Sequence, residues 1–185
     1  MSERWRCFVA MPIDESLRFA LGKVVGGWTA QALRWTEPAN WHLTLAFLGP
    51  TYSARVASIR AVTERVGDTH APMHLRTGGL DAFPSAGQAR VLWYGIHDPD
   101  GTLAALAEDL QSALGVDVTG PFCPHLTLAR ARREPVDLTQ WLAEASAPEG
   151  ALDVDRLHLM RSHLSAGPAR YETLGSALLR AAARV

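Results

Sequence analysis

His42-Leu43-Thr44-Leu45-Ala46 and His125-Leu126-Thr127-Leu128-Ala129 are identical pentapeptides in this chain of 185 residues. A chance repeat of five residues is expected in roughly one chain in a hundred of this length, which favours a structural repeat. Alternate side chains of an extended strand share a face, so each histidine points the same way as its threonine while the leucines enter the core. Two unrelated amphipathic strands would explain the shared leucines. They would not explain why the histidine and the threonine are also identical, so these two polar residues indicate a shared function.

Helical and strand patterns alternate on both sides of the repeat, and no low-complexity linker divides the chain. Apolar residues recur at helical spacing in residues 17–28, 56–66 and 103–114 and in a shorter segment from Asp137. Strand patterns cover residues 5–10, 33–36, 42–48, 73–77, 90–96, 125–129, 152–161 and 171–174. Many of these strands have one polar face. The pattern predicts one α+β domain over residues 1–185, with antiparallel sheets covered by helices on one side.

Three local signals refine this outline. Asp14 precedes the first helical segment and is expected to cap it. Gly49–Ser53 mixes glycine, proline and serine, which is typical of a surface turn. The apolar alternation of residues 152–161 slips by one position near Asp155, which predicts a bulge in that strand.

The composition excludes some classes of function. The chain has 18 basic and 19 acidic residues and a formal net charge of −1, whereas a protein that coats long nucleic acid usually has a basic excess. Recognition of a small or terminal group is therefore favoured, and a local basic cluster stays open as an alternative. No signal peptide is evident, and no apolar run approaches the ~18 residues of a membrane span. A cytoplasmic monomer is the default expectation.

Two histidines and two threonines on facing strands are suited to phosphoryl transfer. If two similar lobes face each other, the two His-Thr faces line one cleft. One imidazole can be neutral while the other is protonated near neutral pH. The neutral imidazole takes a proton from water, the protonated one gives a proton to a departing alkoxide, and the threonine hydroxyls donate to anionic oxygens.

Metal binding is the competing use of the two histidines. Zinc usually takes three or four protein ligands, and threonine is not among them. Cys7 and Cys123 are the only cysteines, and their spacing resembles neither a metal knuckle nor a redox pair. The other histidines are scattered, without carboxylates at ligand spacing: His70, His74, His97, His158 and His163. The sequence predicts no metal and no other cofactor.

With both motifs in place, the sequence resembles the 2H phosphoesterase superfamily. Within it, the chain is similar to the RNA 2′,3′-cyclic phosphodiesterases, historically named 2′-5′ RNA ligases. Further segments agree in order along the chain: Arg6–Ala10, Arg34–Trp35, Asn40–His42, Gly79–Pro84, Arg90–Trp93, Pro124–Arg130 and Gly167–Glu172. The resemblance implies a bilobal fold with pseudo-two-fold symmetry, in which two mainly antiparallel sheets line a central cleft and helices lie outside.

The resemblance also implies the reaction and the roles of the motif residues. Water attacks a 2′,3′-cyclic phosphate at an RNA end or in a cyclic nucleotide, without a metal, and leaves a 2′-phosphomonoester. His42 is the expected proton donor to the leaving 3′ oxygen, and His125 is the expected proton acceptor. Thr44 and Thr127 are expected to hold the nonbridging oxygens. The identical motifs do not by themselves distinguish the acid from the base.

The two copies diverge at Phe47 and Arg130, each five residues after its histidine. In regular strands both would lie on the face opposite the histidines, although a twist or bulge could bring Arg130 to the cleft rim. The family pattern favours Arg130 as a phosphate contact, and the alternative is a surface arginine. Phe47 is a candidate for stacking on a base, with core packing as its alternative. Tyr171 either lines the cleft or packs within the last strand.

Two other functions stay open from the sequence. The same groups could catalyse reversible 2′-5′ RNA ligation, or act on another cyclic phosphate such as a nucleotide-sugar derivative. A non-catalytic module that binds an RNA end or a nucleotide is the alternative from outside enzymology.

Overall fold

The structure is a computed structural model that describes residues 3–28, 32–117, 120–163 and 169–181. Its strands are β1 (Arg4–Pro12), β2 (Leu33–Trp35), β3 (His42–Tyr52), β4 (Met73–Phe83), β5 (Val91–His97), β6 (His125–Ala131), β7 (Gly150–Val154), β8 (Arg156–His163) and β9 (Arg170–Leu178). Its helices are α1 (Glu15–Val25), α2 (Val56–Gly67), α3 (Thr102–Leu114) and α4 (Thr139–Glu144), with short 3₁₀ turns η1 (Pro38–Asn40), η2 (Ser53–Arg55) and η3 (Ala86–Gln88). Every helix and strand segment expected from the sequence forms at least part of one of these elements.

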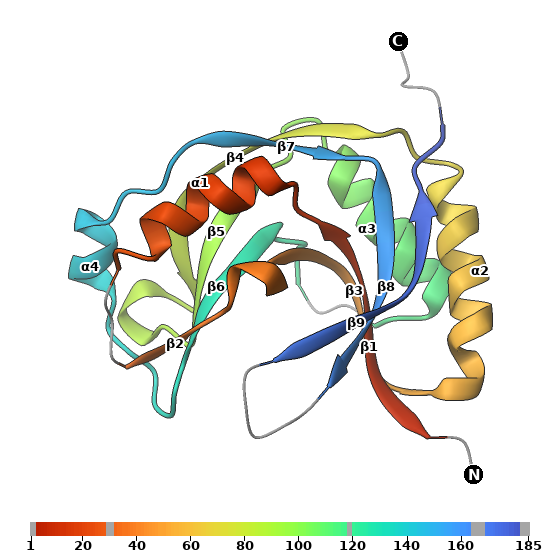
Figure 1. The fold of residues 1–185 in the computed structure, drawn as a ribbon, viewed down its shortest axis with the longest axis horizontal. Coiled ribbons are helices and arrows are strands. Elements are labelled where there is room, and N and C mark those ends of the chain that lie inside the picture. The colour runs from red at the N-terminus through yellow and green to blue at the C-terminus, as the bar shows by residue number, and fades with distance from the viewer. Residues whose placement is uncertain (1–2, 29–31, 118–119, 164–168, 182–185) are drawn as a thin grey trace.

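The described strands form one nine-stranded sheet in which every pairing is antiparallel. The order is β7-β4-β5-β6-β3-β1-β8-β9, and β2 pairs with β6. The two expected sheets are thus the two halves of one continuous sheet, joined where Leu43 of β3 pairs with Leu126 of β6. Figure 1 shows the halves curling into an arch. The α+β class with antiparallel strands is confirmed.

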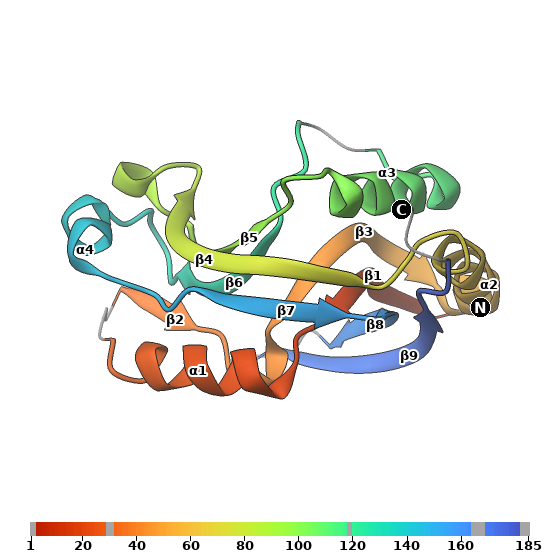
Figure 2. The ribbon, with the colours of Figure 1, turned by 90° about the horizontal axis from the view of Figure 1, so that it is seen from above.

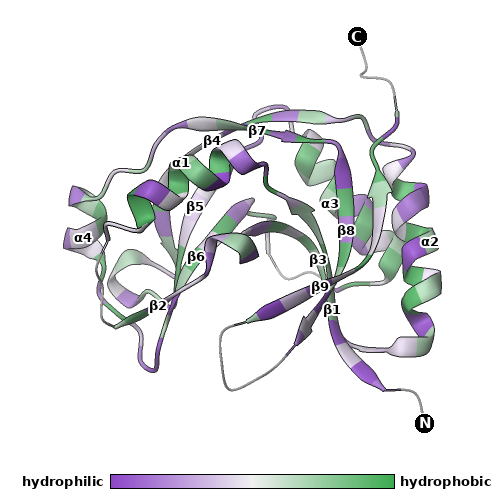
Figure 3. Ribbon diagram, in the orientation of Figure 1, coloured by the Kyte–Doolittle hydropathy of each residue, from purple (hydrophilic) through white to green (hydrophobic). Residues whose placement is uncertain are grey.

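The helices lie on the outside of this arch. Figure 2 shows α1 on one side of the molecule and α3 on the other, with the strands between them. α2 packs on β8 and β9, and α3 packs on β3. In Figure 3 these helices carry both green and purple segments, as amphipathic helices do. Their buried residues join the strand leucines in one apolar core. No helix in the described ranges has the length and apolar character needed to cross a bilayer.

Asp14 caps α1 as expected, because its Oδ1 accepts a hydrogen bond from the Leu17 amide at 2.7 Å. The turn expected at Gly49–Ser53 is wrong. β3 continues to Tyr52, and Gly49 takes a positive φ of 64° inside the strand. Only the last residue of the expected turn leaves the strand, since η2 begins there.

The single strand expected over residues 152–161 is two strands. β7 pairs with β4 in one half of the sheet, whereas β8 pairs with β1 in the other half. The chain changes partner at Asp155, where the apolar alternation slips. The predicted bulge is therefore wrong, because at this position the chain crosses from one half of the sheet to the other. The crossing is possible because the arch brings the β7 edge back toward β8 (Figure 1).

Candidate active site

The two motifs lie side by side at the junction of the halves. Leu43 and Leu126 pair across β3 and β6 and are both 0% exposed. Extending this antiparallel register by one residue each way places His42 across from Thr127 and Thr44 across from His125. These four half-buried residues share the face opposite the leucines, and we call it the His–Thr face. Diagonal neighbours on such a face are about 7–8 Å apart, which leaves space for one small anion between the imidazoles.

Both imidazoles are held by the same backbone hydrogen bond. Nδ1 of His42 lies 2.7 Å from the carbonyl oxygen of Asn40, and Nδ1 of His125 lies 2.8 Å from the carbonyl oxygen of Cys123. A carbonyl oxygen only accepts, so Nδ1 carries the proton and donates in each case. Nε2 of each ring is therefore the atom that can exchange a proton with a ligand.

Aromatic rings fix the orientation of His42. The Phe8 ring stacks on the imidazole with centroids 4.8 Å apart, and the Tyr171 ring meets its edge at 5.0 Å. Tyr171 therefore contacts a motif histidine rather than only packing within β9. Asn40 supports the same region, because its side-chain amide donates to the Ala169 carbonyl oxygen at 2.8 Å, just before β9.

His125 has an equivalent pair of aromatic neighbours. The Phe83 ring meets its edge at 5.0 Å, and the Trp93 ring lies 6.0 Å from it. Phe83 and Trp93 stack on each other at 5.1 Å. Phe8 and Phe83 belong to neither motif, and nothing in the motifs marks them as site residues. Only the strand pairing reveals them, because each lies far from its histidine in the chain.

A β-bulge in each motif strand changes which residues reach the His–Thr face. In β3, Thr44 pairs with Ala10 and Ala46 pairs with Val9, so Leu45 is the extra residue. In β6, Thr127 pairs with Trp93 and Ala129 pairs with Leu92, so Leu128 is the extra residue. An extra residue reverses the alternation of the side chains that follow it. The motif strands are therefore irregular at equivalent positions, as the pseudo-two-fold symmetry implied by the resemblance leads us to expect.

The bulge in β6 turns Arg130 onto the His–Thr face. The regular-strand expectation for this residue is wrong, and the alternative of a bulge near the strand end is confirmed. The side chain is exposed, and its positive charge lowers the pKa of both His42 and His125. Arg130 therefore adds positive charge to the face that carries both imidazoles, which favours an anion held there.

The bulge in β3 likewise turns Phe47 onto the His–Thr face. This residue pairs with Phe8, whose ring stacks on His42, so both share the His–Thr face. The Phe47 side chain is 45% exposed, which shows that the core-packing alternative is wrong. The Arg6 guanidinium lies over the Phe47 ring, 4.6 Å from its centroid. The face thus presents an exposed aromatic ring with a cation on it.

The electrostatics of the site favour neutral imidazoles in the free protein. Burial is the main cause that lowers the pKa of His42, and the charges of Arg130 and His125 lower it further, against the hydrogen bond to Asn40, which raises it. Burial also lowers the pKa of His125, with a smaller contribution from Arg130. An anion between the rings would oppose these effects, because it stabilises the protonated form.

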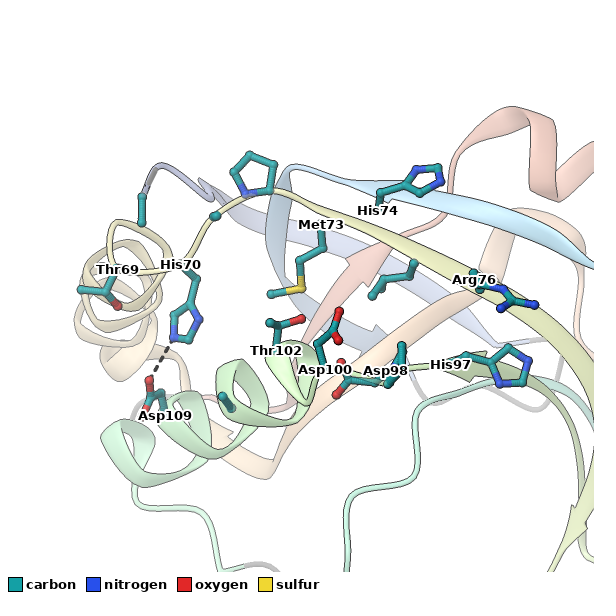
Figure 4. A pocket seen from close by; sticks show the side chains of 16 residues that line it. Thr69, His70, Met73, His74, Arg76, His97, Asp98, Asp100, Thr102 and Asp109 are labelled. Carbon is teal, nitrogen blue, oxygen red and sulfur yellow. Dashed lines mark hydrogen bonds and ion pairs between the residues drawn. The ribbon is translucent and has the colours of Figure 1, made fainter. Parts of the chain in front are cut away.

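A hollow lies away from the two motifs. Figure 4 shows the side chains that line it, between the end of α2, the start of β4, the end of β5 and the start of α3. The volume of this cavity is about 830 Å³. His70, His74 and His97 line it, and Nε2 of His70 lies at hydrogen-bond distance, 2.9 Å, from Oδ2 of Asp109. These histidines gather here although they are scattered in the sequence. Among the described residues, no three His, Cys, Asp or Glu side chains form a group that could hold a metal ion.

Comparison with known sequences identifies a family and named relatives. A sequence model of the 2′-5′ RNA ligase superfamily matches residues 26–166. A protein of Archaeoglobus fulgidus named RNA 2′,3′-cyclic phosphodiesterase is 30% identical over 166 residues, which cover 86% of this chain and 92% of the relative. A protein of the same name from Methanothermobacter thermautotrophicus is 29% identical over 173 residues, which cover 88% and 93%.

Solved structures show the same architecture. A crystal structure of a Thermus thermophilus protein superimposes with a TM-score of 0.78 at 26% identity, covering 95% of this chain and 98% of that chain. Escherichia coli LigT in complex with 3′-AMP superimposes with a TM-score of 0.77 at 25% identity, covering 97% and 100%. The likeness therefore extends over nearly the whole chain.

Proposed function

The chain belongs to the 2′-5′ RNA ligase superfamily, and from that premise we propose that it hydrolyses 2′,3′-cyclic phosphates at RNA ends to 2′-phosphomonoesters. The observation that carries the proposal is the meeting of both His-Thr pairs on one face, which Arg130 shares. Relatives that match most of the chain are named RNA 2′,3′-cyclic phosphodiesterase. The E. coli LigT structure contains a nucleotide, which supports a nucleotide-sized ligand.

The proposed reaction uses the free Nε2 atoms. Nε2 of His125 takes a proton from a water molecule, and the water oxygen forms a bond to phosphorus. The bond between phosphorus and the 3′ oxygen breaks, and protonated His42 gives its proton to that oxygen. The phosphate stays on the 2′ oxygen. The hydroxyls of Thr44 and Thr127 donate hydrogen bonds to the nonbridging oxygens, and Arg130 stabilises their negative charge.

The substrate itself supplies part of what His42 needs. In the free protein the buried position of His42 and the positive charge of Arg130 lower its pKa and disfavour the protonated donor. A cyclic phosphate diester carries one negative charge, and its arrival beside the imidazole raises the pKa. Protonation of the donor is thus coupled to binding of the anion.

This coupling predicts a pH effect with a definite sign. The profile of kcat/KM reports the free enzyme, and the profile of kcat reports the complex. Since the bound anion raises the pKa of both imidazoles, we expect the limbs of the kcat profile to lie at higher pH than those of kcat/KM. Initial rates with a 2′,3′-cyclic mononucleotide at a series of pH values test this. Coincident profiles, or a kcat profile shifted to lower pH, would contradict it.

Phe47 is proposed to stack on the base of the terminal nucleotide, since its exposed ring shares the face of His42. Stacking on an aromatic side chain contributes about 1–3 kcal/mol per base. We therefore expect Phe47→Ala to raise KM for a cyclic mononucleotide by roughly 5- to 150-fold with little change in kcat. The measurement is steady-state kinetics on cyclic nucleotides with and without a base.

Tyr52→Ala is the matched control for Phe47. Tyr52 lies at the far end of β3, is also 45% exposed and carries the Arg4 guanidinium at the same 4.6 Å from its ring. The control should leave the KM for a mononucleotide unchanged. Equal effects of the two substitutions, or an equal loss on a ribose cyclic phosphate without a base, would refute the role of Phe47.

Tyr171 is proposed to form one side of the substrate site next to His42, because its ring contacts the His42 imidazole. Its ring limits the rotation of the imidazole and covers one side of the leaving oxygen. Tyr171 is thus a positioning residue as well as a candidate substrate contact.

The proposed function is tested directly with chelator-treated protein and a dinucleotide that ends in a 2′,3′-cyclic phosphate. Exclusive formation of the 2′-phosphate supports it, and no turnover, or a 3′-phosphate product, overturns it. Adding an RNA strand with a 5′ hydroxyl tests ligation, in which that hydroxyl replaces water in the same step. Binding of the substrate without turnover would instead support a non-catalytic module that binds an RNA end or a nucleotide.

Three expectations stay predictions from the sequence: a single domain over residues 1–185, a cytoplasmic location and a monomeric state.

A further inference from the structure

Arg34 lies directly across from Arg130 on the edge of the site. β2 pairs with β6 so that Arg34 is the partner of Arg130, between the pairs Leu33–Ala131 and Trp35–Ala129. Side chains of directly opposed residues point to the same face of a sheet. Because the bulge in β6 turns Arg130 onto the His–Thr face, Arg34 shares that face.

The position of β2 places this arginine beyond the histidines. β5 pairs with β6 along one edge of that strand, from His125 to Arg130, and β3 pairs with the other edge at Leu126. β2 therefore continues the edge used by β3, starting three residues further along β6. Arg34 and Arg130 therefore lie side by side on neighbouring strands, three residues along β6 from the level of His42 and Thr127.

Two guanidinium groups in this arrangement repel each other. Both side chains are exposed, and opposed residues of neighbouring antiparallel strands have Cα atoms only about 4.5–5.5 Å apart. Like charges directly opposite on a sheet destabilise it. In the part of the chain that the structure describes, neither Arg34 nor Arg130 forms an ion pair with a carboxylate. An anion between the two guanidinium groups would remove this repulsion.

We infer that Arg34, together with Arg130, binds the phosphodiester on the 5′ side of the terminal nucleoside. The inference rests on the proposed function, which places the cyclic phosphate between the imidazoles. The next anion along an RNA chain is the phosphodiester one nucleotide further in. A guanidinium pair binds phosphate oxygens well, since each can donate two hydrogen bonds in one plane.

A second phosphate site would distinguish oligonucleotides that end in a cyclic phosphate from cyclic mononucleosides. A nucleoside 2′,3′-cyclic phosphate has no second phosphate and leaves Arg34 without a ligand. An oligonucleotide with a cyclic end occupies both positions. The chain is therefore built to process RNA ends in preference to cyclic mononucleosides, although its overall charge is only −1. The positive charge is concentrated at one edge of the site.

The test compares Arg34→Gln with Arg65→Gln on two substrates. Arg65 is an exposed residue of α2, which packs on the other face of the sheet, so its substitution changes the net charge equally. The substrates are adenosine 2′,3′-cyclic phosphate and a dinucleotide that ends in the same group. We expect Arg34→Gln to lower kcat/KM about tenfold on the dinucleotide, through KM, because a charge-assisted hydrogen bond is lost. On the mononucleoside it should leave kcat/KM unchanged.

Two further measurements separate binding from a structural role. Arg34→Lys keeps the charge but loses the planar pair of donors, so it should restore only part of the loss. The melting temperature of Arg34→Gln should equal or exceed that of the parent, because a repulsion is removed. An equal loss on both substrates, no loss beyond that of Arg65→Gln, or a lowered melting temperature overturns the inference. If the parent protein turns over neither substrate, the proposed function itself has failed.

Discussion

Alanine in place of His42 or of His125 is expected to lower turnover of a 2′,3′-cyclic phosphate by about 10²–10⁴-fold, the usual contribution of a general acid or base. The two losses should not add. Acid and base act in one step, so the double variant should be about as slow as the slower single variant. Both the size of the losses and their non-additivity are tested by rates measured at a saturating concentration of a dinucleotide that ends in a 2′,3′-cyclic phosphate.

His97→Ala is the control for these substitutions. His97 is an exposed histidine at the end of β5, and it lines the cavity of Figure 4 rather than the His–Thr face. Its replacement should leave turnover unchanged. Full activity of either motif variant would remove that histidine from the reaction.

A substrate with sulfur in place of the 3′ oxygen separates the acid from the base. A thiolate leaves without protonation, so a variant that lacks the acid recovers on this substrate, while a variant that lacks the base does not. With His42 as the donor, His42→Ala should approach the parent rate and His125→Ala should stay slow. The reverse result would assign the donor role to His125, which is the less buried of the two imidazoles.

Leu126→Ala is expected to destabilise the fold by about 2–5 kcal/mol, the range for buried leucines replaced by alanine. Leu126 is fully buried and pairs with Leu43 where the two halves of the sheet join. The cavity would therefore open directly behind His125. Denaturant unfolding, with the slope compared to the parent, measures the change in free energy.

Leu178→Ala is the matched control for the junction. Leu178 is a strand leucine at the end of β9 that is 43% exposed. Because the residue is partly in water already, its replacement should cost less than about 1 kcal/mol. Similar losses for the two variants would show that the junction has no special weight in the stability of the sheet.

Local sequence was sufficient for most of the secondary structure and for the central pair of residues. The period of two in each motif assigns the histidine and threonine to one face, because alternation is a property of any extended strand. The helical spacing before and after the motifs identifies the helices for a similar reason. Asp14 was identifiable as a cap because capping involves only the next three residues.

The neighbours of the histidines could not be derived in this way. Phe8 and Tyr171 contact His42 from β1 and β9, at opposite ends of the chain. Phe83 and Trp93 contact His125 from β4 and β5. These contacts depend on strand order and register, which are fixed by pairings between distant segments. No window of sequence contains both partners.

The sequence by itself determined that two His-Thr pairs occur on amphipathic strands in one α+β chain. Only the tertiary structure decided what surrounds them. A bulge at Leu45 and another at Leu128 turn Phe47 and Arg130 onto the His–Thr face, and the register of β2 sets Arg34 opposite Arg130. The physical reason is that a bulge belongs to a pair of strands: an extra residue exists only relative to the partner that lacks it.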